Sequence, residues 1–300
     1  MNFYIVDAFT EEVMGGNTAG VILLDQDSGP LNTAYMGKLA AELKYNITVF
    51  VCRLSGREFG LKFFSPADEV DLCGHATIAA FTAMMDAGWI TEDGRYSYQT
   101  PVGILEAVIK EGFVLIEQGE GRTVHEISSQ LELGRLYEIL GVRCQEVHGR
   151  GLDGRDILLY PTAVSTGIVD LMVPVENLGE LWQVDPDYHV LKKMSREYEV
   201  ASFHVYALDE SGTAAARCRN FAPLYGVMED IATGTANASL AYHLYSRGMV
   251  PQKKESVFIQ GEKLGRPSKI LTYIKNCGEG NVKIQVGGKG AILVRGTISL

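Results

Sequence analysis

The sequence has no excess of positive charge. Its 300 residues include 27 basic and 37 acidic side chains, which gives a formal net charge of −10 and a pI of about 5.2. Proteins that bind nucleic acids or anionic lipid surfaces do so through clustered lysine and arginine side chains. We therefore expect no nucleic acid and no membrane as partner, and the composition favours a small molecule or a second subunit.

Long apolar runs and paired cysteines are missing as well. Residues 1–7 contain no basic stretch and end in an aspartate, and no uncharged apolar run reaches the roughly 18 residues of a membrane span. The cysteines are Cys52, Cys73, Cys144, Cys218 and Cys277. Their odd number and the lack of CxxC spacing are typical of neither a disulfide framework nor a zinc ribbon. These absences predict a cytoplasmic protein with reduced thiols.

Motifs for nucleotides and metals are also absent. The sequence contains no P-loop, no GxGxxG after a predicted strand, and no pair of histidines at metal spacing. Gly15-Gly16 is not followed by the rest of a dinucleotide fingerprint. The sequence therefore shows none of the usual motifs for a nucleotide, a dinucleotide or a metal ion.

The chain contains an internal repeat. Each half has a predicted hairpin that ends in a Phe-x-Pro box, followed by an acidic loop and a glycine that opens a small-residue helix. The positions that recur at an offset of 160 are Gly74 and Gly234, Ala76 and Ala236, and Gly88 and Gly248. The pattern predicts helices over 74–86 and 234–247, each ending before a glycine. Two unrelated helices with shared glycine caps are the alternative, but the conserved order of elements favours duplication.

The boundary between the halves is predicted near residue 121, where strand signal gives way to glycine and charge. Residues 1–121 then form an N-terminal half and residues 122–300 a C-terminal half, with the last strand a candidate to pair with the first half. An amphipathic segment at 127–142 is predicted as a surface helix. Paired strands are expected after each central helix, with a turn at 276–278 in the second half. We expect the halves to enclose one shared cleft.

Polar residues gather at the predicted N-termini of the two central helices. They are Asp68, Glu69, Asp71, Cys73, His75 and Thr77 at one, and Glu229, Asp230, Thr233, Thr235 and Asn237 at the other. Tight packing explains the small residues of both helices but not this polar loading. A helix N-terminus offers unpaired amides and a positive dipole end, so Gly74, Gly234 and Thr235 are candidates to bind a substrate carboxylate. The same dipoles would stabilise the negative charge that develops when a neighbouring carbon loses a proton.

Four boxes of the sequence resemble those of the PhzF-like family, named for phenazine biosynthesis and related in fold to diaminopimelate epimerase. They are Asp7-Ala8-Phe9 with residues 16–21, residues 71–77 (Asp-Leu-Cys-Gly-His-Ala-Thr), residues 221–236, and Gln260-Gly261 with residues 265–268. The resemblance covers nearly the whole chain. It implies an α+β fold of two pseudo-symmetric halves, each a β-barrel-like sheet wrapped around a central helix. It further implies a homodimer without cofactor or metal that acts as an isomerase.

The resemblance also implies the site residues. His75 and Asp230 match the active-site histidine and aspartate of the family, and Asn17, in the first box, is assigned to substrate binding. Cys73 falls where diaminopimelate epimerase carries one of two catalytic thiols, and the place of the other thiol is near Ile231. A thiol at a helix N-terminus can act as a base, although a small buried hydrophobic residue is the alternative interpretation of Cys73.

One position departs from the family pattern. Ile47 stands where the phenazine isomerases carry their catalytic glutamate, and Glu42, which matches an earlier glutamate, is interpreted as helix surface. The leading hypothesis is a cofactor-independent isomerase or epimerase that moves a proton on a small carboxylate substrate. The alternative is a non-catalytic protein that binds a small ligand or a partner and has lost the key glutamate.

Overall fold

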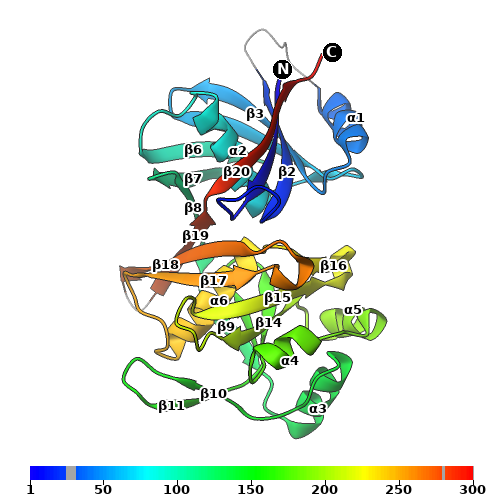
Figure 1. Ribbon diagram of the computed structural model, residues 1–300, viewed down its shortest axis with the longest axis vertical. Helices are drawn as coiled ribbons and strands as arrows, with labels where there is room; N and C mark the ends of the chain where they lie inside the picture. Colours follow the sequence, from blue (N-terminus) through cyan, green and yellow to red (C-terminus); the bar gives the residue numbers. More distant parts are fainter. Residues whose placement is uncertain (25–31, 279–280, 300) are drawn as a thin grey trace. The chain divides into compact units, whose positions relative to one another are not determined.

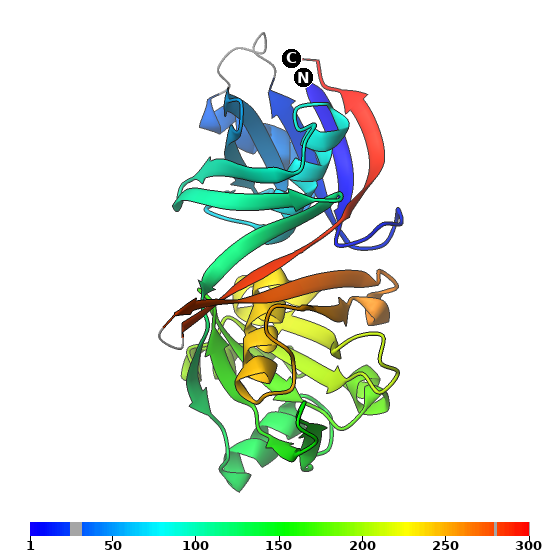
Figure 2. The ribbon, with the colours of Figure 1, turned by 90° about the vertical axis from the view of Figure 1, so that its left-hand side faces the viewer.

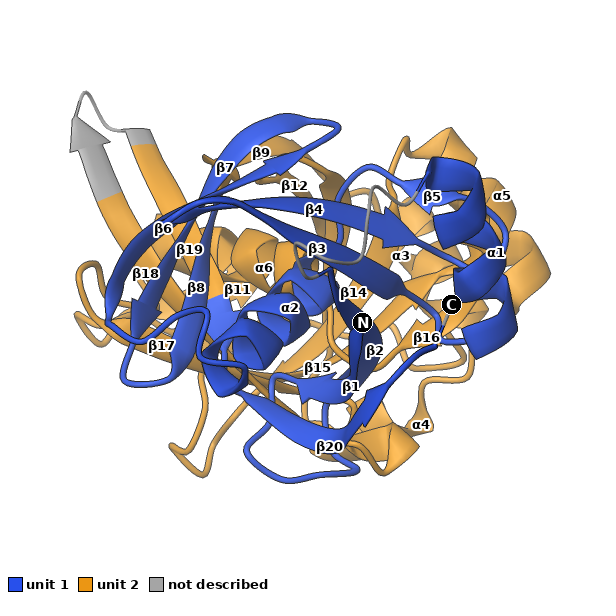
Figure 3. Ribbon diagram, turned by 90° about the horizontal axis from the view of Figure 1, so that it is seen from above, with its two compact units in different colours: residues 1–117, 287–300 blue, residues 118–286 orange. Residues whose placement is uncertain are grey.

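A computed structural model describes residues 1–24, 32–278 and 281–299. The chain divides into two compact units, residues 1–117 with 287–300 and residues 118–286 (Figure 3). The first division thus falls after Glu117, whereas the sequence placed the boundary after residue 121. The chain leaves the first unit within strand β8 (Phe113–Glu120) and returns within β19 (Asn281–Gly288).

The first unit is mainly sheet, with two helices (Figure 1). Its strands are β1 (Asn2–Ala8), β2 (Asn17–Leu24), β3 (Thr48–Ser55), β4 (Glu58–Phe64), β5 (Glu69–Val70), β6 (Gly94–Thr100), β7 (Gly103–Lys110) and, at the end of the chain, β20 (Gly290–Thr297). Its helices are α1 (Thr33–Leu43) and α2 (Gly74–Asp86). β7 and β8 form a hairpin whose two turn residues, Glu111 and Gly112, both have positive φ, as in a type I′ turn.

The second unit contains more helices around a similar sheet. Its strands are β9 (Arg122–Glu126), β10 (Val147–Arg150), β11 (Asp156–Leu159), β12 (Thr162–Ser165), β13 (Val169–Pro174), β14 (Ser202–Leu208), β15 (Ala216–Ala222), β16 (Val227–Asp230), β17 (Glu255–Gln260) and β18 (Ser268–Gly278). Its helices are α3 (Gln130–Ile139), α4 (Leu178–Gln183), α5 (Tyr188–Glu197) and α6 (Gly234–Ser246), with short 3₁₀ turns at Pro223–Tyr225 and Glu262–Leu264.

The strand pairing of the two units matches element by element. In the first unit β2 and β3 are parallel, β3 and β4 antiparallel, and β4 pairs with β5 antiparallel and with β6 in parallel. In the second unit β13, β14, β15, β16 and β17 repeat these relations in the same order. In the first unit β20 pairs antiparallel with β1, and in the second unit β9 pairs antiparallel with β12 in the corresponding place. The internal repeat predicted from the sequence is therefore confirmed in the topology.

The two predicted central helices are confirmed as α2 and α6. Every residue of α2 from Ala76 to Met84 is buried, and α6 is buried over a similar length. Many of these side chains are small (alanine, serine and threonine), so strands can pack closely against all sides of each helix. α2 packs against β1, β2, β3 and β20, and α6 packs against β12, β13, β14 and β18. Each helix stops before a glycine with φ of +71°, Gly88 or Gly248, as the sequence predicted.

The remaining helices cover the other sides of these strands. Met36 and Ala40 of α1 pack on Ile22, Phe50 and Phe64. In the second unit α3, α4 and α5 enclose a larger apolar core with strands β12 to β15. α3 confirms the amphipathic helix predicted within 127–142.

The last strand of the chain closes the first unit. β20 runs antiparallel to β1, from Asn2 opposite Thr297 to Ala8 opposite Gly290, so the first and last strands lie side by side (Figure 2). The turn expected at 276–278 is instead part of β18, which extends to Gly278, and residues 279–280 lie outside the described residues. No helix in the described part of the chain is long and apolar enough to span a membrane.

Candidate active site

The N-terminus of α2 brings Cys73 and His75 into contact. Cys73 is the N-cap, in an extended conformation with φ −143° and ψ 113°, and Gly74 is the first helical residue. The Cys73 Sγ lies 3.3 Å from His75 Nδ1, and both residues are partly exposed. Thr77 Oγ1 donates a 2.8 Å hydrogen bond to the Cys73 carbonyl, which holds the cap against the first turn. A thiol and an imidazole at this separation can exchange a proton, so either can serve as a base.

Asn17 lies in the same unit, buried at the start of β2. The loop before it is organised by Asp7, which is fully buried and accepts hydrogen bonds from the Met14 amide at 2.8 Å and the Thr18 hydroxyl at 2.5 Å. Gly16 has a φ of +58°, and a Cβ there would clash with the backbone of β1, so this position requires glycine. These hydrogen bonds and the glycine at position 16 therefore fix the conformation of the loop that precedes Asn17.

Asp230 and Thr233 form a second polar pair, at the N-terminus of α6. Asp230 is the last residue of β16, and Thr233 is the N-cap of the helix. The Thr233 hydroxyl donates to Asp230 Oδ2 at 2.6 Å. Asp230 and Thr235 are partly exposed, whereas Gly234 is buried. A partly exposed carboxylate that is oriented by one hydroxyl has the features of a general acid or base.

The residues predicted from the sequence thus fall into two groups. Cys73, Gly74 and His75 share the start of α2, which packs against β2, the strand that begins with Asn17. Asp230, Gly234 and Thr235 share the start of α6 in the second unit. Their positions at the ends of these elements agree with the sequence analysis, and their functional roles stay predictions.

Two side chains near Asp230 were given no role in the sequence analysis, although Thr233 was noted among the polar residues at this helix N-terminus. The first is Thr233, which corresponds to Cys73 as helix N-cap. The offset of 160 that relates the two helices already pointed to this position. The other is Gln260, which was seen only as part of a sequence box.

Ile47 lies between α1 and β3. It is partly exposed, and its carbonyl accepts a 3.1 Å hydrogen bond from the Gly20 amide of β2. Glu42 is exposed on α1, as predicted. An isoleucine side chain has no group that can carry a proton, so this position offers no acid or base.

A buried ion pair anchors the strand that carries Asp230. Arg219 of β15 donates to Glu229 of β16 through Nε at 2.8 Å and through Nη2 at 2.7 Å, and the two side chains are only 5% and 10% exposed. Arg219 Nη1 also donates to the carbonyls of Leu181 and Val184. Because Glu229 directly precedes Asp230, this pair holds the strand that carries Asp230 against β15.

A second buried polar network lies in the same unit. Ser202 Oγ contacts Asp170 Oδ1 at 2.6 Å and Asn220 Oδ1 at 2.8 Å, and His204 Nδ1 lies 3.1 Å from Asn220 Oδ1. Burial raises the pKa of Asp170 to about 7 and lowers the pKa of His204 to about 4. Both side chains are therefore held in their neutral forms near pH 6.

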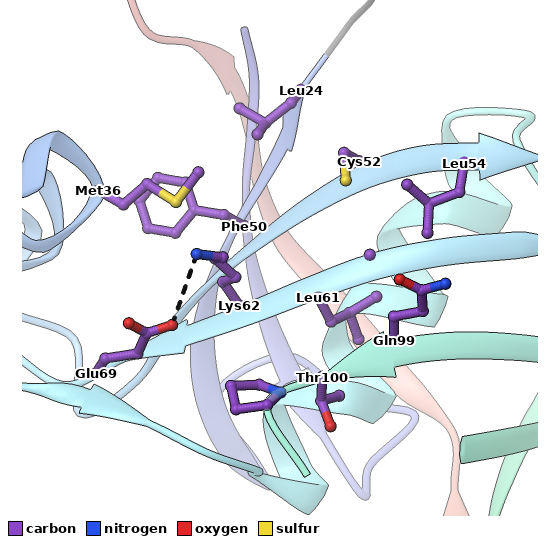
Figure 4. A pocket seen from close by; sticks show the side chains of 12 residues that line it. Leu24, Met36, Phe50, Cys52, Leu54, Leu61, Lys62, Glu69, Gln99 and Thr100 are labelled. Carbon is purple, nitrogen blue, oxygen red and sulfur yellow. Dashed lines mark ion pairs between the residues drawn. The ribbon is translucent and has the colours of Figure 1, made fainter. Parts of the chain in front are cut away.

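A pocket lies on β3 and β4 of the first unit. Its volume is about 470 Å³, and it is lined by Leu24, Met36 and Phe50 and by the Lys62–Glu69 ion pair, 3.9 Å apart (Figure 4). None of the predicted site residues lines it. Within residues 1–24, 32–278 and 281–299, no cluster of three or more His, Cys, Asp and Glu side chains could hold a metal ion.

Comparisons with known proteins agree with this topology. An uncharacterized isomerase of Deinococcus radiodurans is 34% identical over 96% of this chain and 91% of its own length. A trans-2,3-dihydro-3-hydroxyanthranilate isomerase of Pseudomonas fluorescens is 27% identical over 100% of this chain and 99% of its own. The crystal structure of a PhzF-family phenazine biosynthesis protein of Bacillus anthracis superposes with a TM-score of 0.84 at 24% identity, covering 100% of this chain and 99% of that one.

The predicted fold class is confirmed by the structural match, and the names of the relatives support an activity of the isomerase type. The family model described as phenazine biosynthesis-like protein matches residues 6–296, nearly the whole chain. The chain belongs to this family, PhzC-PhzF.

Proposed function

We propose that this protein is a cofactor-independent isomerase that moves a proton on a small carboxylate substrate. The observation that carries the proposal is the pairing of titratable side chains with hydrogen-bond partners at two helix N-termini. Cys73 Sγ lies 3.3 Å from His75 Nδ1 at α2, and Asp230 Oδ2 accepts from Thr233 Oγ1 at α6. Relatives named trans-2,3-dihydro-3-hydroxyanthranilate isomerase act on a carboxylate, which supports this class of substrate.

His75 and Asp230 are the proposed acid and base. An imidazole can both accept and donate a proton near neutral pH, and a carboxylate can remove a proton from an activated carbon. Either group can take a proton from a substrate carbon and return it at a second position or face. Cys73 fixes the orientation of the His75 ring and can hold the proton between the two steps.

The helix N-termini supply the charge stabilisation for such a step. The first amides of α2 and α6 have no partner inside the helix, and the glycines at 74 and 234 carry no side chain that would shield these amides. Removing one amide donor that faces a developing enolate-like oxygen lowers the rate by about 10²–10³-fold. Asn17 is the proposed side-chain contact to the same substrate.

Solvent deuterium incorporation tests the proposal. The protein is incubated in deuterated water with a panel of amino acids, hydroxy acids and dihydroaromatic acids, and mass spectrometry follows deuterium at carbon. We expect one class of acid to gain deuterium with the wild type, and to gain about 10²–10⁴ times less with His75→Ala or Asp230→Asn. A labelling rate that both variants leave unchanged would assign the chemistry to other residues.

A ligand-binding protein without catalysis is the second candidate, and Ile47 is the observation that favours it. The panel separates the two functions. Acids that raise the melting temperature of the protein but gain no deuterium would identify a binding protein. Labelling that depends on Asp230 would identify an enzyme.

A further inference from the structure

Gln260 ends strand β17 beside the end of β16, which carries Asp230. β17 pairs with β15 up to Gln260 opposite Cys218, and β16 pairs with β15 from Asp230 opposite Asn220. The opposite edge of β15 is occupied by β14, so β16 and β17 follow one another along the same edge. This register places Gln260 next to Asp230, although the residues are 30 positions apart in the sequence.

The Gln260 amide is buried and makes four hydrogen bonds, all to residues between Asp230 and Asn237. Its Nε2 donates to the Asp230 carbonyl at 2.8 Å and to Thr233 Oγ1 at 3.1 Å. Its Oε1 accepts from the Thr233 amide at 3.1 Å and from Asn237 Nδ2 at 2.8 Å. An amide side chain offers two donors and two acceptor lone pairs, so every hydrogen-bonding position is used.

One of these bonds acts on Asp230 through Thr233. Because Gln260 Nε2 donates to Thr233 Oγ1, the single hydroxyl proton of Thr233 is left to point at Asp230 Oδ2, which it reaches at 2.6 Å. The chain of donors runs from Gln260 through Thr233 to the carboxylate. Without the amide, the hydroxyl could turn away from Asp230.

The residues that follow Gln260 hold the same turn from its other side. Gly261 has a φ of +84°, and a Cβ there would collide with the backbone oxygens of Ile231 and Arg266. Ser268 Oγ lies 3.4 Å from the Ile231 carbonyl. The sequence boxes at 260–261 and 265–268 therefore pack on residues 230–233.

The first unit provides an internal comparison. When the Phe-x-Pro boxes are aligned, Phe64 at the end of β4 matches Phe221 of β15, and Gln260, opposite Cys218, matches Thr100 at the end of β6. Thr100 is partly exposed, and its hydroxyl donates to the Gly103 carbonyl at 3.3 Å, within its own hairpin. This strand end thus makes a local contact in one unit and a saturated buried contact in the other, so the repeat alone does not explain Gln260.

We propose that Gln260 is a positioning residue that clamps the turn from Asp230 to Thr233 and directs the Thr233 hydroxyl at the Asp230 carboxylate. The catalytic part of this inference rests on the proposed function of Asp230. The clamp itself is a property of the protein without substrate, so it can be measured separately.

Backbone hydrogen exchange of the unliganded protein tests the clamp. Gln260→Met keeps the approximate volume and removes all four hydrogen bonds, and we expect exchange over residues 230–235 to rise at least tenfold while residues 74–82 of α2 are unchanged. Gln260→Glu keeps an acceptor for the Thr233 amide but loses both donors, so protection of that amide is retained. Tyr137→Phe is the control, because it removes a buried 2.6 Å hydrogen bond to the Pro174 carbonyl in the same unit, away from this turn. It should leave exchange over 230–235 at the wild-type rate.

Activity tests the directing role on any acid that the wild type labels with deuterium. We expect Gln260→Met, Gln260→Glu and Thr233→Val each to lower kcat by about 10²-fold with little change in KM, because the carboxylate is misplaced and the substrate contacts are not. Thr233→Ser, which restores a hydroxyl, should recover most of the rate, and Tyr137→Phe should match the wild type.

Two results would overturn the clamp. One is an exchange rate over residues 230–235 of Gln260→Met that equals the wild-type rate, and the other is a rise in exchange rate spread evenly over the second unit. Full activity of Thr233→Val would overturn the directing role. If the wild type labels no acid, the proposed function fails while the exchange data still decide the clamp. If Gln260→Met does not fold, Gln260→Glu tests the clamp through the lost bond to the Asp230 carbonyl, and Thr233→Val tests the directing role.

Discussion

Asp170 makes the stability of the protein depend on pH in a predictable direction. Its carboxyl is fully buried, and burial raises its pKa to about 7, above the value of about 3.9 expected in the unfolded chain. The folded state therefore holds a proton that the unfolded state releases between pH 4 and pH 7. This contribution is fully present below pH 4 and is lost as the pH rises through 7. His204 has the opposite sign over an overlapping range, because burial lowers its pKa to about 4.

Asp170→Asn separates these two contributions. An asparagine can still accept the Ser202 hydrogen bond but carries no charge at any pH. We expect the free energy of unfolding of the wild type to fall relative to the variant between pH 4 and pH 7, by about 4 kcal/mol at most, since each unit of pKa shift is worth about 1.4 kcal/mol. Urea titrations of both proteins at pH 4, 5.5 and 7 measure the difference. A constant difference across this range would mean that Asp170 titrates normally.

Ile47 sets the expectation for phenazine-type isomerisation. Isoleucine cannot transfer a proton, and Glu42 is exposed on α1, so neither residue replaces the family glutamate. We expect negligible isomerisation of trans-2,3-dihydro-3-hydroxyanthranilate by the wild type, followed by absorbance, and a measurable gain with Ile47→Glu because a positioned acid or base is worth about 10²–10⁴ in rate. Glu42→Gln is the control and should have no effect. Rapid turnover by the wild type that Asp230→Asn abolishes would show that another group does this work.

At the scale of elements, the Arg219–Glu229 pair determines how firmly β16 is attached to β15. Removing Glu229 leaves the Arg219 charge buried without a carboxylate, with two carbonyls and the Phe221 ring as its remaining contacts, so Glu229→Ala should lower the free energy of unfolding by about 3–5 kcal/mol. Arg135–Glu197 is a matched control, because it is also bidentate, at 2.7 and 2.8 Å, but both side chains are close to half exposed. Glu197→Ala should cost much less, because water screens an exposed ion pair. Equal losses in chemical denaturation would show that burial does not decide the effect.

At the scale of the whole molecule, the last strand of the chain belongs to the first unit. β20 supplies the antiparallel partner of β1 and packs on α2, so deletion of residues 289–300 exposes one edge of β1 and one side of the helix. We expect hydrogen exchange to accelerate in β1 and α2 while α6 in the second unit stays protected. Deletion of residues 299–300 alone is the control and should change neither. Loss of protection in α6 as great as that in α2 would contradict the assignment of β20 to the first unit.

The sequence predicted those parts of the fold that depend on local signals. The helices at 74–86 and 234–246 follow from an opening glycine, small residues and a closing glycine, all within about 15 positions. The hairpin turns follow from glycine and polar residues at the turn itself. The repeat was visible because the same local signals return at an offset of 160. The extent of β18 was misjudged, since a glycine at 278 suggested a turn where the strand in fact continues to Gly278.

By itself the sequence determined the family, the two central helices and the titratable residues at their N-termini, because each of these is written in a few consecutive positions. Only the tertiary structure decided what surrounds those residues. The contact of Gln260 with Asp230 and Thr233 depends on two strands that meet along one edge of β15, and the burial of Asp170 and His204 depends on how β13, β14 and β15 are covered. Strand register and burial arise from pairing between distant segments, and no local pattern in the chain specifies which partner a polar side chain will meet.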